Sequence, residues 1–472
     1  MADKNQLFLG SFVHSKTLGE LEYLHNTAVC VDRAGRIVAI EKDCDEKARA
    51  ALLSRLEWKD SEVEVVSARE GQFFFPGFVD THLHASQYPN VGIFGSSTLL
   101  DWLNTYTFPL EASLSDPAKA RRVYTRVIRR TLSHGTTCAA YYATIDVAST
   151  TLLAELCVSH GQRALVGRVC MDTGSPVNYR DASPEAALAA ARESIAQIQD
   201  LDKDMVLVRP IITPRFAPAC SADLLRQLGL LAAETGLPVQ THVSENKDEI
   251  ALVKKLFPRK NTGAGDDSYT AVYDAFGLLT SRTILAHGVH LTDDEAALIA
   301  RRGAKVSHCP CSNSALASGA ARVRWLVTEK DIVCGLGTDM SGGYSPSVLE
   351  AARQAVLVSR HVAIGAGGEE KDKLSVEEAL FLATRGGACV VGLEDKVGGF
   401  EVGMEWDAQL VGLGRVGDEA GEEEEGGDDD DGNVDLFGWE SWPERIAKWV
   451  YNGDDRNTKK VWVRGRLVHE RK

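Results

Sequence analysis

The sequence predicts an α/β protein built on a (β/α)8 TIM-like barrel, together with a small β-sandwich domain formed by both chain ends. Short apolar strands alternate with capped helices in the middle of the chain, as in parallel βαβ units. The two ends are instead rich in strands and turns. With 472 residues, the chain exceeds the roughly 250–300 residues at which single cores stop growing. The alternation also permits an open parallel sheet, which stays as the alternative architecture.

Both chain ends show the pattern of β-hairpins. Near the N-terminus, after a first short strand at Leu7–Leu9, the strand-like segments Thr27–Val31 and Arg36–Ile40 flank a turn that contains glycine. Near the C-terminus, Lys460–Val463 and Arg466–Val468 flank another. We therefore expect both ends to build one small β domain. The predicted segments are 1–75, 76–398 and 399–472, the last with an acidic insert at 417–433.

Caps and breakers mark the helices of the middle segment. Ser115 and Pro117 open a helix that we expect to run to His134, where Gly135 stops it. The same kinds of signal predict further helices that begin at Ser183, Ser221 and Thr292. Apolar stretches of strand length lie between the helices, at 136–140, 205–212, 238–242, 282–287, 304–307 and 332–339. A closed barrel is favoured over an open sheet for this many repeats.

The composition indicates a soluble intracellular protein. The net charge is −15, but ten acids lie between Asp418 and Asp431, and removing ten negative charges leaves −5. Such a tract is typical of a solvated, disordered loop. An acidic chain is a poor ligand for nucleic acid, and the chain lacks the roughly 18 unbroken apolar residues of a membrane span. Ten cysteines without a secretory signal predict reduced thiols and a cytoplasmic location.

Polar residues follow several of the predicted barrel strands. His82 and His84 end an apolar strand, and alternate residues of a strand point to the same side, so both imidazoles can reach one metal ion. Two later strands end on His242 and His287, and another apolar run ends on Asp339. Imidazoles with a carboxylate are typical ligands of zinc or iron(II). Each residue alone has an ordinary structural explanation, but together they predict a metal-dependent active site.

Longer motifs around these residues resemble those of the amidohydrolase superfamily and, more narrowly, the guanine deaminase family. The resemblance spans nearly the whole chain. It is carried by segments 76–84, 84–87, 99–109, 213–216, 241–245, 286–288, 308–313, 337–339 and 453–457. The acidic tract departs from the family pattern as an insertion, and it lies outside every matching motif.

The resemblance implies one zinc ion per subunit, bound by His82, His84, His242 and Asp339. Two-metal members of the superfamily use a lysine at the end of the fourth strand, and the stretch from Val206 to Phe216 contains no lysine. The implied reaction is hydrolysis of guanine by water to xanthine and ammonia. Asp339 would accept the proton of the water, Glu245 would protonate the ring, and His287 would stabilise the attacking oxygen. The resemblance also implies a homodimer.

The same resemblance implies a set of substrate-binding residues. The guanidinium of Arg215 would pair with O6 and N7 of guanine, and the amide of Gln87 would bind the ring edge. Phe216 would stack on the purine, and Trp102 would form a wall of the pocket. His242, Glu245 and Asp339 are expected to contact the substrate as well as to serve the metal or the proton transfer.

Other functions remain open from the sequence. A related deaminase or chlorohydrolase that acts on another purine, a pyrimidine or a triazine would share the metal ligands. The residues that distinguish guanine from such substrates are Gln87, Trp102, Arg215 and Phe216. A scaffold protein without activity is a more distant alternative, and the presence of every expected ligand argues against it.

Overall fold

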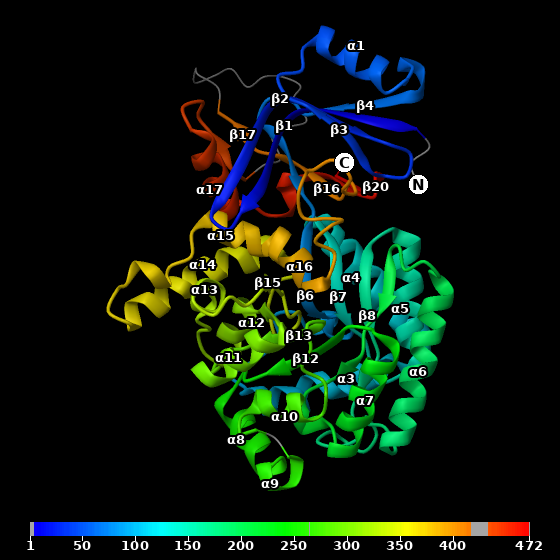
Figure 1. Cartoon of the computed structure of the whole chain (residues 1–472), viewed down its shortest axis with the longest axis vertical. Helices are drawn as coiled ribbons and strands as arrows, with labels where there is room; N and C mark the ends of the chain where they lie inside the picture. The colour runs from blue at the N-terminus through cyan, green and yellow to red at the C-terminus, as the bar shows by residue number, and fades with distance from the viewer. Residues whose placement is uncertain (1–3, 264, 417–432, 472) are drawn as a thin grey trace.

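The structure is a computed structural model that describes residues 4–263, 265–416 and 433–471. Figure 1 shows two parts: a barrel of strands and helices below, and above it a β domain that holds both chain ends. The predicted fold class is therefore confirmed in its architecture.

The barrel wall consists of two four-stranded parallel sheets in the described residues. One sheet has the order β10-β8-β7-β6 and the other β12-β13-β14-β15. Their bounds are β6 Phe78–His84, β7 Thr136–Tyr142, β8 Arg163–Gly167, β10 Val208–Pro210, β12 Val239–Val243, β13 Thr283–His287, β14 Lys305–His308 and β15 Cys334–Leu336. A short pair, β9 (Val169–Cys170) and β11 (Thr213–Pro214), extends the wall.

Two seams close these sheets into a ring. At the first seam, Ile212 bridges to Val239, and Gln240 N–H donates to the Ile212 carbonyl at 2.9 Å. At the second, the N–H of Asp339 donates to the carbonyl of His82 at 2.8 Å. The closed barrel is thus realised, and the second seam joins the strand of His82 to the segment of Asp339.

Helices surround the barrel (Figure 1). The longer ones are α4 Pro117–Ser133, α5 Val147–His160, α6 Pro184–Leu201, α7 Ala222–Thr235, α8 Lys247–Leu256, α11 Asp293–Arg302 and α14 Val348–Gly365. Shorter ones are α2 Leu99–Trp102, α3 Phe108–Ala112, α9 Arg259–Thr262, α10 Tyr269–Ala275, α12 Pro310–Ala315, α13 Val323–Thr328, α15 Val376–Phe381 and α16 Gly387–Val391. Outside the barrel lie α1 Glu46–Arg55 and α17 Trp442–Asn452.

The helices begin where the sequence predicts, although the cap of α4 is Asp116, which lies between the expected Ser115 and Pro117. The side chain of Asp116 accepts from Ala118 N–H and Lys119 N–H at the start of α4, and Thr292 caps α11 in a capping box with Glu295. Helices α7 and α11 end at glycines with left-handed backbone, Gly236 and Gly303.

Strand bounds agree less well with the sequence pattern. The predicted strands at 205–212 and 332–339 are only three residues each, β10 and β15, because continuous ladder pairing covers only the middle of each apolar stretch. Conversely, β1 (Asn5–Thr17) and β2 (Glu20–Val31) are much longer than the short stretches expected. Their extra length includes polar residues that face solvent and break the apolar pattern.

The β domain is one mixed sheet of eight strands drawn from both chain ends. Its order is β20-β19-β16-β5-β1-β2-β3, with β4 paired to β1. The remaining bounds are β3 Ile37–Glu41, β4 Val63–Ser67, β5 Gln72–Pro76, β16 Ala408–Gly412, β19 Thr458–Val463 and β20 Arg466–Glu470.

This sheet rolls around its own apolar core. Phe8 of β1 lies 5.3 Å from Trp462 of β19 between ring centroids, although three strand spacings, about 14 Å, would separate them in a flat sheet. Phe8 also stacks on Trp406 at 4.2 Å. The two halves of one sheet therefore enclose a core in the manner of a sandwich.

The predicted acidic insert, 417–433, lies almost entirely outside the described residues. It connects β17 (Gly414–Arg415) to β18 (Asp435–Leu436), which pair in parallel. Among the described helices, none has the length and apolar character needed to span a bilayer.

A buried ion pair joins the barrel to the β domain. Arg163, the first residue of β8, donates from Nε to Asp407 Oδ2 at 2.6 Å and also pairs with Glu405. Both acids precede β16, and all three side chains are buried. The contact lies at the N-terminal end of a barrel strand, where side chains serve stability.

Asp407→Ala is expected to destabilise the protein by about 3 kcal/mol, because it leaves a buried guanidinium short of its counter-charge. Urea unfolding followed by tryptophan fluorescence measures the change. As a control, Glu234→Ala breaks the exposed Arg192–Glu234 pair and should cost at most about 1 kcal/mol. Equal effects of the two substitutions would contradict this role of the buried pair.

Candidate active site

β6 supplies the first two side chains of the site. His82 and His84 lie two residues apart on this fully buried strand, so both imidazoles point to the barrel interior. Their rings meet edge to face with centroids 5.0 Å apart. The expectation that both can approach one point is therefore met by the geometry.

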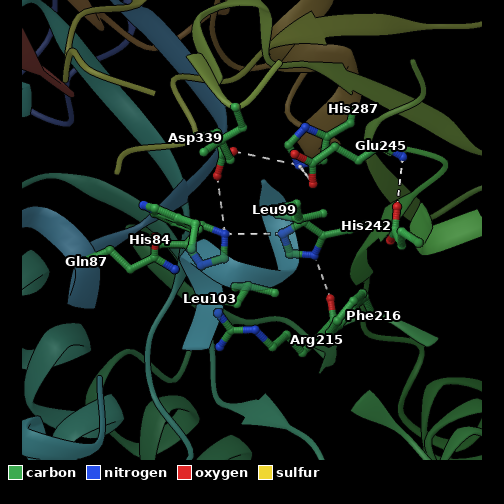
Figure 2. Close-up of a pocket in the computed structure, with 13 residues that line it drawn as sticks. His84, Gln87, Leu99, Leu103, Arg215, Phe216, His242, Glu245, His287 and Asp339 are labelled. Atoms are coloured by element: carbon green, nitrogen blue, oxygen red, sulfur yellow. Dashed lines mark hydrogen bonds and ion pairs between the residues drawn. The ribbon is translucent and has the colours of Figure 1, made fainter. Parts of the chain in front are cut away.

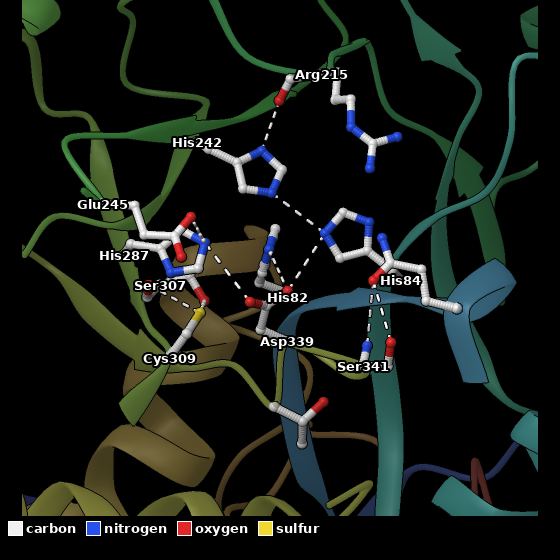
Figure 3. Close-up of polar contacts among 12 residues, drawn as sticks. His82, His84, Arg215, His242, Glu245, His287, Ser307, Cys309, Asp339 and Ser341 are labelled. Atoms are coloured by element: carbon white, nitrogen blue, oxygen red, sulfur yellow. Dashed lines mark hydrogen bonds and ion pairs between the residues drawn. The ribbon is translucent and has the colours of Figure 1, made fainter. Parts of the chain in front are cut away.

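Parallel pairing brings further residues to the same end of the barrel. In the pairing of β12 with β13, His242 lies opposite Ala286 and Val243 opposite His287. Asp339 lies three residues beyond β15 and is held at the seam with β6. The carboxyl ends of four strands thus bring all five of these side chains together, as Figure 3 shows.

The donor atoms of this group lie within a few ångströms of each other. His84 Nε2 is 3.2 Å from His242 Nε2. Asp339 Oδ1 is 3.2 Å from His82 Nε2 and 3.3 Å from His84 Nε2. The ligand atoms of His82, His84 and His242 all lie within 4.8 Å of one another.

The protonation state of these imidazoles suits a metal ion. The Nδ1 of His242 lies 2.6 Å from the carbonyl of Arg215, which fixes the proton on Nδ1 and leaves the Nε2 lone pair directed at the site. Burial lowers the pKa of His82, His84 and His242, so the rings are neutral ligands. Within the described part of the chain, buried His82 Nε2 makes no well-formed hydrogen bond. Nitrogen donors beside a carboxylate therefore fit a metal such as zinc.

A second grouping of possible ligands consists of His82, His287 and Cys309. Burial raises the pKa of the Cys309 thiol well above its usual range, and its Sγ lies 3.5 Å from the carbonyl of Ser307. Of this grouping only His287 lines the cavity at this end of the barrel, whereas His84 and His242 of the first cluster both line it. The cluster of His82, His84 and His242 is thus the better metal site.

Glu245 and His287 lie beside the metal-binding cluster. Glu245 Oε2 is 3.4 Å from His287 Nε2, and Oε1 accepts a hydrogen bond from Ser318 at 3.2 Å. Burial raises the pKa of Glu245 to about 7, which suits a group that exchanges protons near neutrality. Asn313 Oδ1 lies 2.9 Å from His287 Nδ1 and orients the ring toward Glu245 and Asp339.

Three non-glycine residues at this end of the barrel have left-handed backbone. They are Ser244 at φ 48°, His287 at φ 74° and Asp339 at φ 45°. This conformation is costly for residues with a Cβ atom and is retained where the surroundings enforce it. It turns the chain sharply after each strand, so that the side chains stay over the barrel mouth.

A cavity opens above the cluster, and Figure 2 shows the side chains around it. Its lining includes the expected residues Gln87, Trp102, Arg215 and Phe216 together with His84, His242, Glu245, His287 and Asp339, and also Leu99, Leu103, Glu249 and Leu316. Trp102 is held by a hydrogen bond from Nε1 to the carbonyl of Ile93 at 3.2 Å. In both close-ups, Arg215 lies across the His84–His242 pair from Asp339 and Glu245.

Sequence reasoning missed two charged residues of this region, Glu111 and Glu249. Glu249, on α8, lines the cavity and accepts hydrogen bonds from Glu245 N–H at 3.0 Å and from Tyr269 OH at 2.8 Å. Glu111, on α3, is 1% exposed and forms a paired contact with Arg215: Oε2 to Nη1 at 2.6 Å and Oε1 to Nη2 at 3.2 Å. Burial would lower the pKa of Arg215, but the Glu111 carboxylate raises it overall. An acid on a helix of five residues has no local signal of such a role. Asn313 is a further omission, although it ends a motif at 308–313 that the sequence did single out.

Comparison with known proteins places the chain in a family. The model of the amidohydrolase family matches residues 73–468. The chain is 46% identical to the probable guanine deaminase of Schizosaccharomyces pombe over 462 residues, covering 98% of this chain and 83% of that protein. It is 39% identical to guanine deaminase of Homo sapiens, covering 98% of this chain and 96% of that protein.

A solved structure is also similar over the full length. Guanine deaminase from C. acetobutylicum, described with guanine bound in its active site, superimposes with a TM-score of 0.84 at 32% identity. The match covers 98% of this chain and 100% of that one. The chain therefore belongs to the amidohydrolase family and, within it, to the guanine deaminases.

Proposed function

We propose that this protein hydrolyses guanine to xanthine and ammonia at a single zinc ion held by His82, His84, His242 and Asp339. The observation that carries the proposal is the position of the imidazole and carboxylate cluster directly beneath a cavity lined by Arg215, Gln87 and Phe216. The full-length similarity to guanine deaminases supports the choice of substrate. Zinc bound there would act as a Lewis acid and lower the pKa of water from about 16 toward about 7.

The protein's own side chains supply the proton transfers. Burial alone would raise the pKa of Asp339, but the neighbouring His82 ring holds it at about 2, so the carboxylate stays ionised and can accept a proton from water at Oδ2. Glu245 can carry a proton at Oε2 to a ring nitrogen. The pKa of His287, although opposed by burial, is raised by Glu245 and Asp339, which favours a positive ring beside the oxygen that attacks.

The reaction balances with these roles. The oxygen of water forms a bond to C2 of guanine, and the bond from C2 to the amino nitrogen breaks. One proton of the water ends on the ring nitrogen, and the other leaves with the amino group as ammonia. Arg215 and Gln87 hold the purine with its O6 and N7 edge away from the metal, while Phe216 and Trp102 enclose the ring and exclude water.

We also propose a cytoplasmic homodimer. All ten cysteines are free thiols, which supports a reducing compartment. The homodimer rests on the resemblance to the family.

Zinc-loaded protein is expected to release ammonia from guanine and not from adenine, cytosine or a triazine. A chelator should abolish this activity and added zinc should restore it. The proposed reaction needs the metal ion to lower the pKa of the attacking water. A coupled ammonia assay measures all four compounds in parallel. Release of ammonia from one of the other compounds would refute the substrate assignment. If zinc is bound and none of the four compounds releases ammonia, a scaffold protein would be favoured.

Glu245→Gln is expected to keep zinc and substrate binding and to lower kcat by about 10²–10⁴-fold, because the amide cannot carry the proton. Metal analysis and steady-state kinetics measure the two effects separately. Unchanged turnover would exclude Glu245 from the proton transfer.

Arg215→Ala is expected to raise KM for guanine by about 10–100-fold with the zinc content unchanged, because charge-assisted hydrogen bonds to the purine are lost. If zinc content fell instead, the assignment of Arg215 to the substrate would be wrong.

A further inference from the structure

The short helix α3 holds the guanidinium of Arg215 from two directions. Glu111 pairs with it through two hydrogen bonds, at 2.6 and 3.2 Å. The ring of Phe108 lies under Arg215 Cζ at 4.9 Å from its centroid. Phe108 and Glu111 are three residues apart and share one face of α3. The helix thus fixes both the plane of the guanidinium and its rotation within that plane.

The same carboxylate holds a second cavity residue. Gln87 Nε2 donates to Glu111 Oε1 at 2.8 Å. Because an ionised carboxylate only accepts hydrogen bonds, this contact sets which end of the Gln87 amide carries the nitrogen. Gln87 Oε1 then faces Ser341, whose N–H lies 3.4 Å away. The orientation of both polar groups that we assign to the purine edge is therefore set by one buried acid.

Glu111 itself has no capacity left for a ligand. Tyr179 OH donates to Oε2 at 2.8 Å, so each carboxylate oxygen accepts two hydrogen bonds, in total from Arg215, Gln87 and Tyr179. A carboxylate offers about four acceptor positions, and all are used. Arg215 and Gln87 line the cavity, whereas Glu111 does not. Of the five N–H donors of Arg215, Glu111 accepts from two.

We propose that Glu111 is a positioning residue that makes the enzyme select a purine with an acceptor oxygen at C6. It acts through Arg215 and Gln87, whose donors it aims at the cavity. This inference rests on the proposed function for the identity of the substrate. The alternative is that Glu111 only neutralises a buried cation, in which case its loss would weaken the fold and not the selectivity.

Binding of two purines that lack the 2-amino group separates these roles. Hypoxanthine has O6 and N7, while unsubstituted purine has N7 but no oxygen at C6. Neither can be deaminated at C2, so calorimetric titration of the zinc-loaded protein measures binding alone. Glu111→Gln replaces an acceptor by an amide whose donors face those of Arg215 and Tyr179. We expect its affinity for hypoxanthine to fall by about 10–100-fold, with a much smaller change for purine and unchanged zinc content.

Two further variants complete the experiment. Tyr179→Phe removes one hydrogen bond to Glu111 and leaves its charge. It should therefore also lower the affinity for hypoxanthine, but by less than Glu111→Gln does. It also keeps the test open if Glu111→Gln does not fold. Asp181→Asn is the matched control: it breaks the buried Arg168–Asp181 pair, which lies outside the cavity lining, and should lower stability without changing either affinity.

The outcomes are distinct. The positioning role would be overturned if Glu111→Gln lowered the affinity for hypoxanthine and for purine equally, or lowered neither. It would also be overturned if Asp181→Asn lowered the affinity for hypoxanthine as much as Glu111→Gln does. Guanine turnover by the unaltered protein is measured in parallel. If guanine is not deaminated but the hypoxanthine effect is found, the proposed function fails while the role of Glu111 in selecting the C6 oxygen stands.

Discussion

The hydrogen bond from Asp339 N–H to the carbonyl of His82, 2.8 Å long, joins the last barrel strand to the first. A parallel barrel must close somewhere, and here it closes between two candidate metal ligands. The N–H of His84 extends the same seam by donating to the Met340 carbonyl at 2.9 Å. Because the seam is part of the ladder that closes the fold, the relative positions of His82, His84 and Asp339 are as rigid as the barrel wall itself.

Charge balance organises the rest of the site. Two buried basic side chains face buried acids: Arg215 faces Glu111, and His287 faces Glu245 and Asp339. Buried charges are tolerated only when they are paired and hydrogen-bonded. Under the proposed function, this pairing divides the cavity into a side for proton transfer, with Glu245, His287 and Asp339, and a side for substrate recognition, with Arg215 and Glu111. The metal-binding histidines lie between the two sides (Figure 2).

The two acids also illustrate how environment separates chemical roles. Both Asp339 and Glu245 are buried, yet the pKa of Asp339 is held near 2 by His82 and that of Glu245 is raised to about 7 by burial. Divergent pKa values of neighbouring carboxyl groups are typical of paired acid and base functions. A second layer, Asn313 and Ser318, holds the groups in place. The left-handed turns at Ser244 and Asp339 are the backbone counterpart of this arrangement.

The sequence by itself determined what depends on near neighbours. The alternation of His82 and His84, the caps of α4 and α11 and the strand ends at His242 and His287 all follow from spacings of two to four residues. Which side chains pair across long stretches of sequence was decided only by the tertiary structure, because closure of the barrel brings them together. Glu111 meets Arg215 across 104 residues of sequence, and Arg163 meets Asp407 across 244. The bounds of β10 and β15 also differ from the expected ones, because ladder pairing, which depends on the neighbouring strand, sets them. Side chains so distant in sequence share no local pattern, and their contact exists only because the parallel ladder fixes where each strand stops.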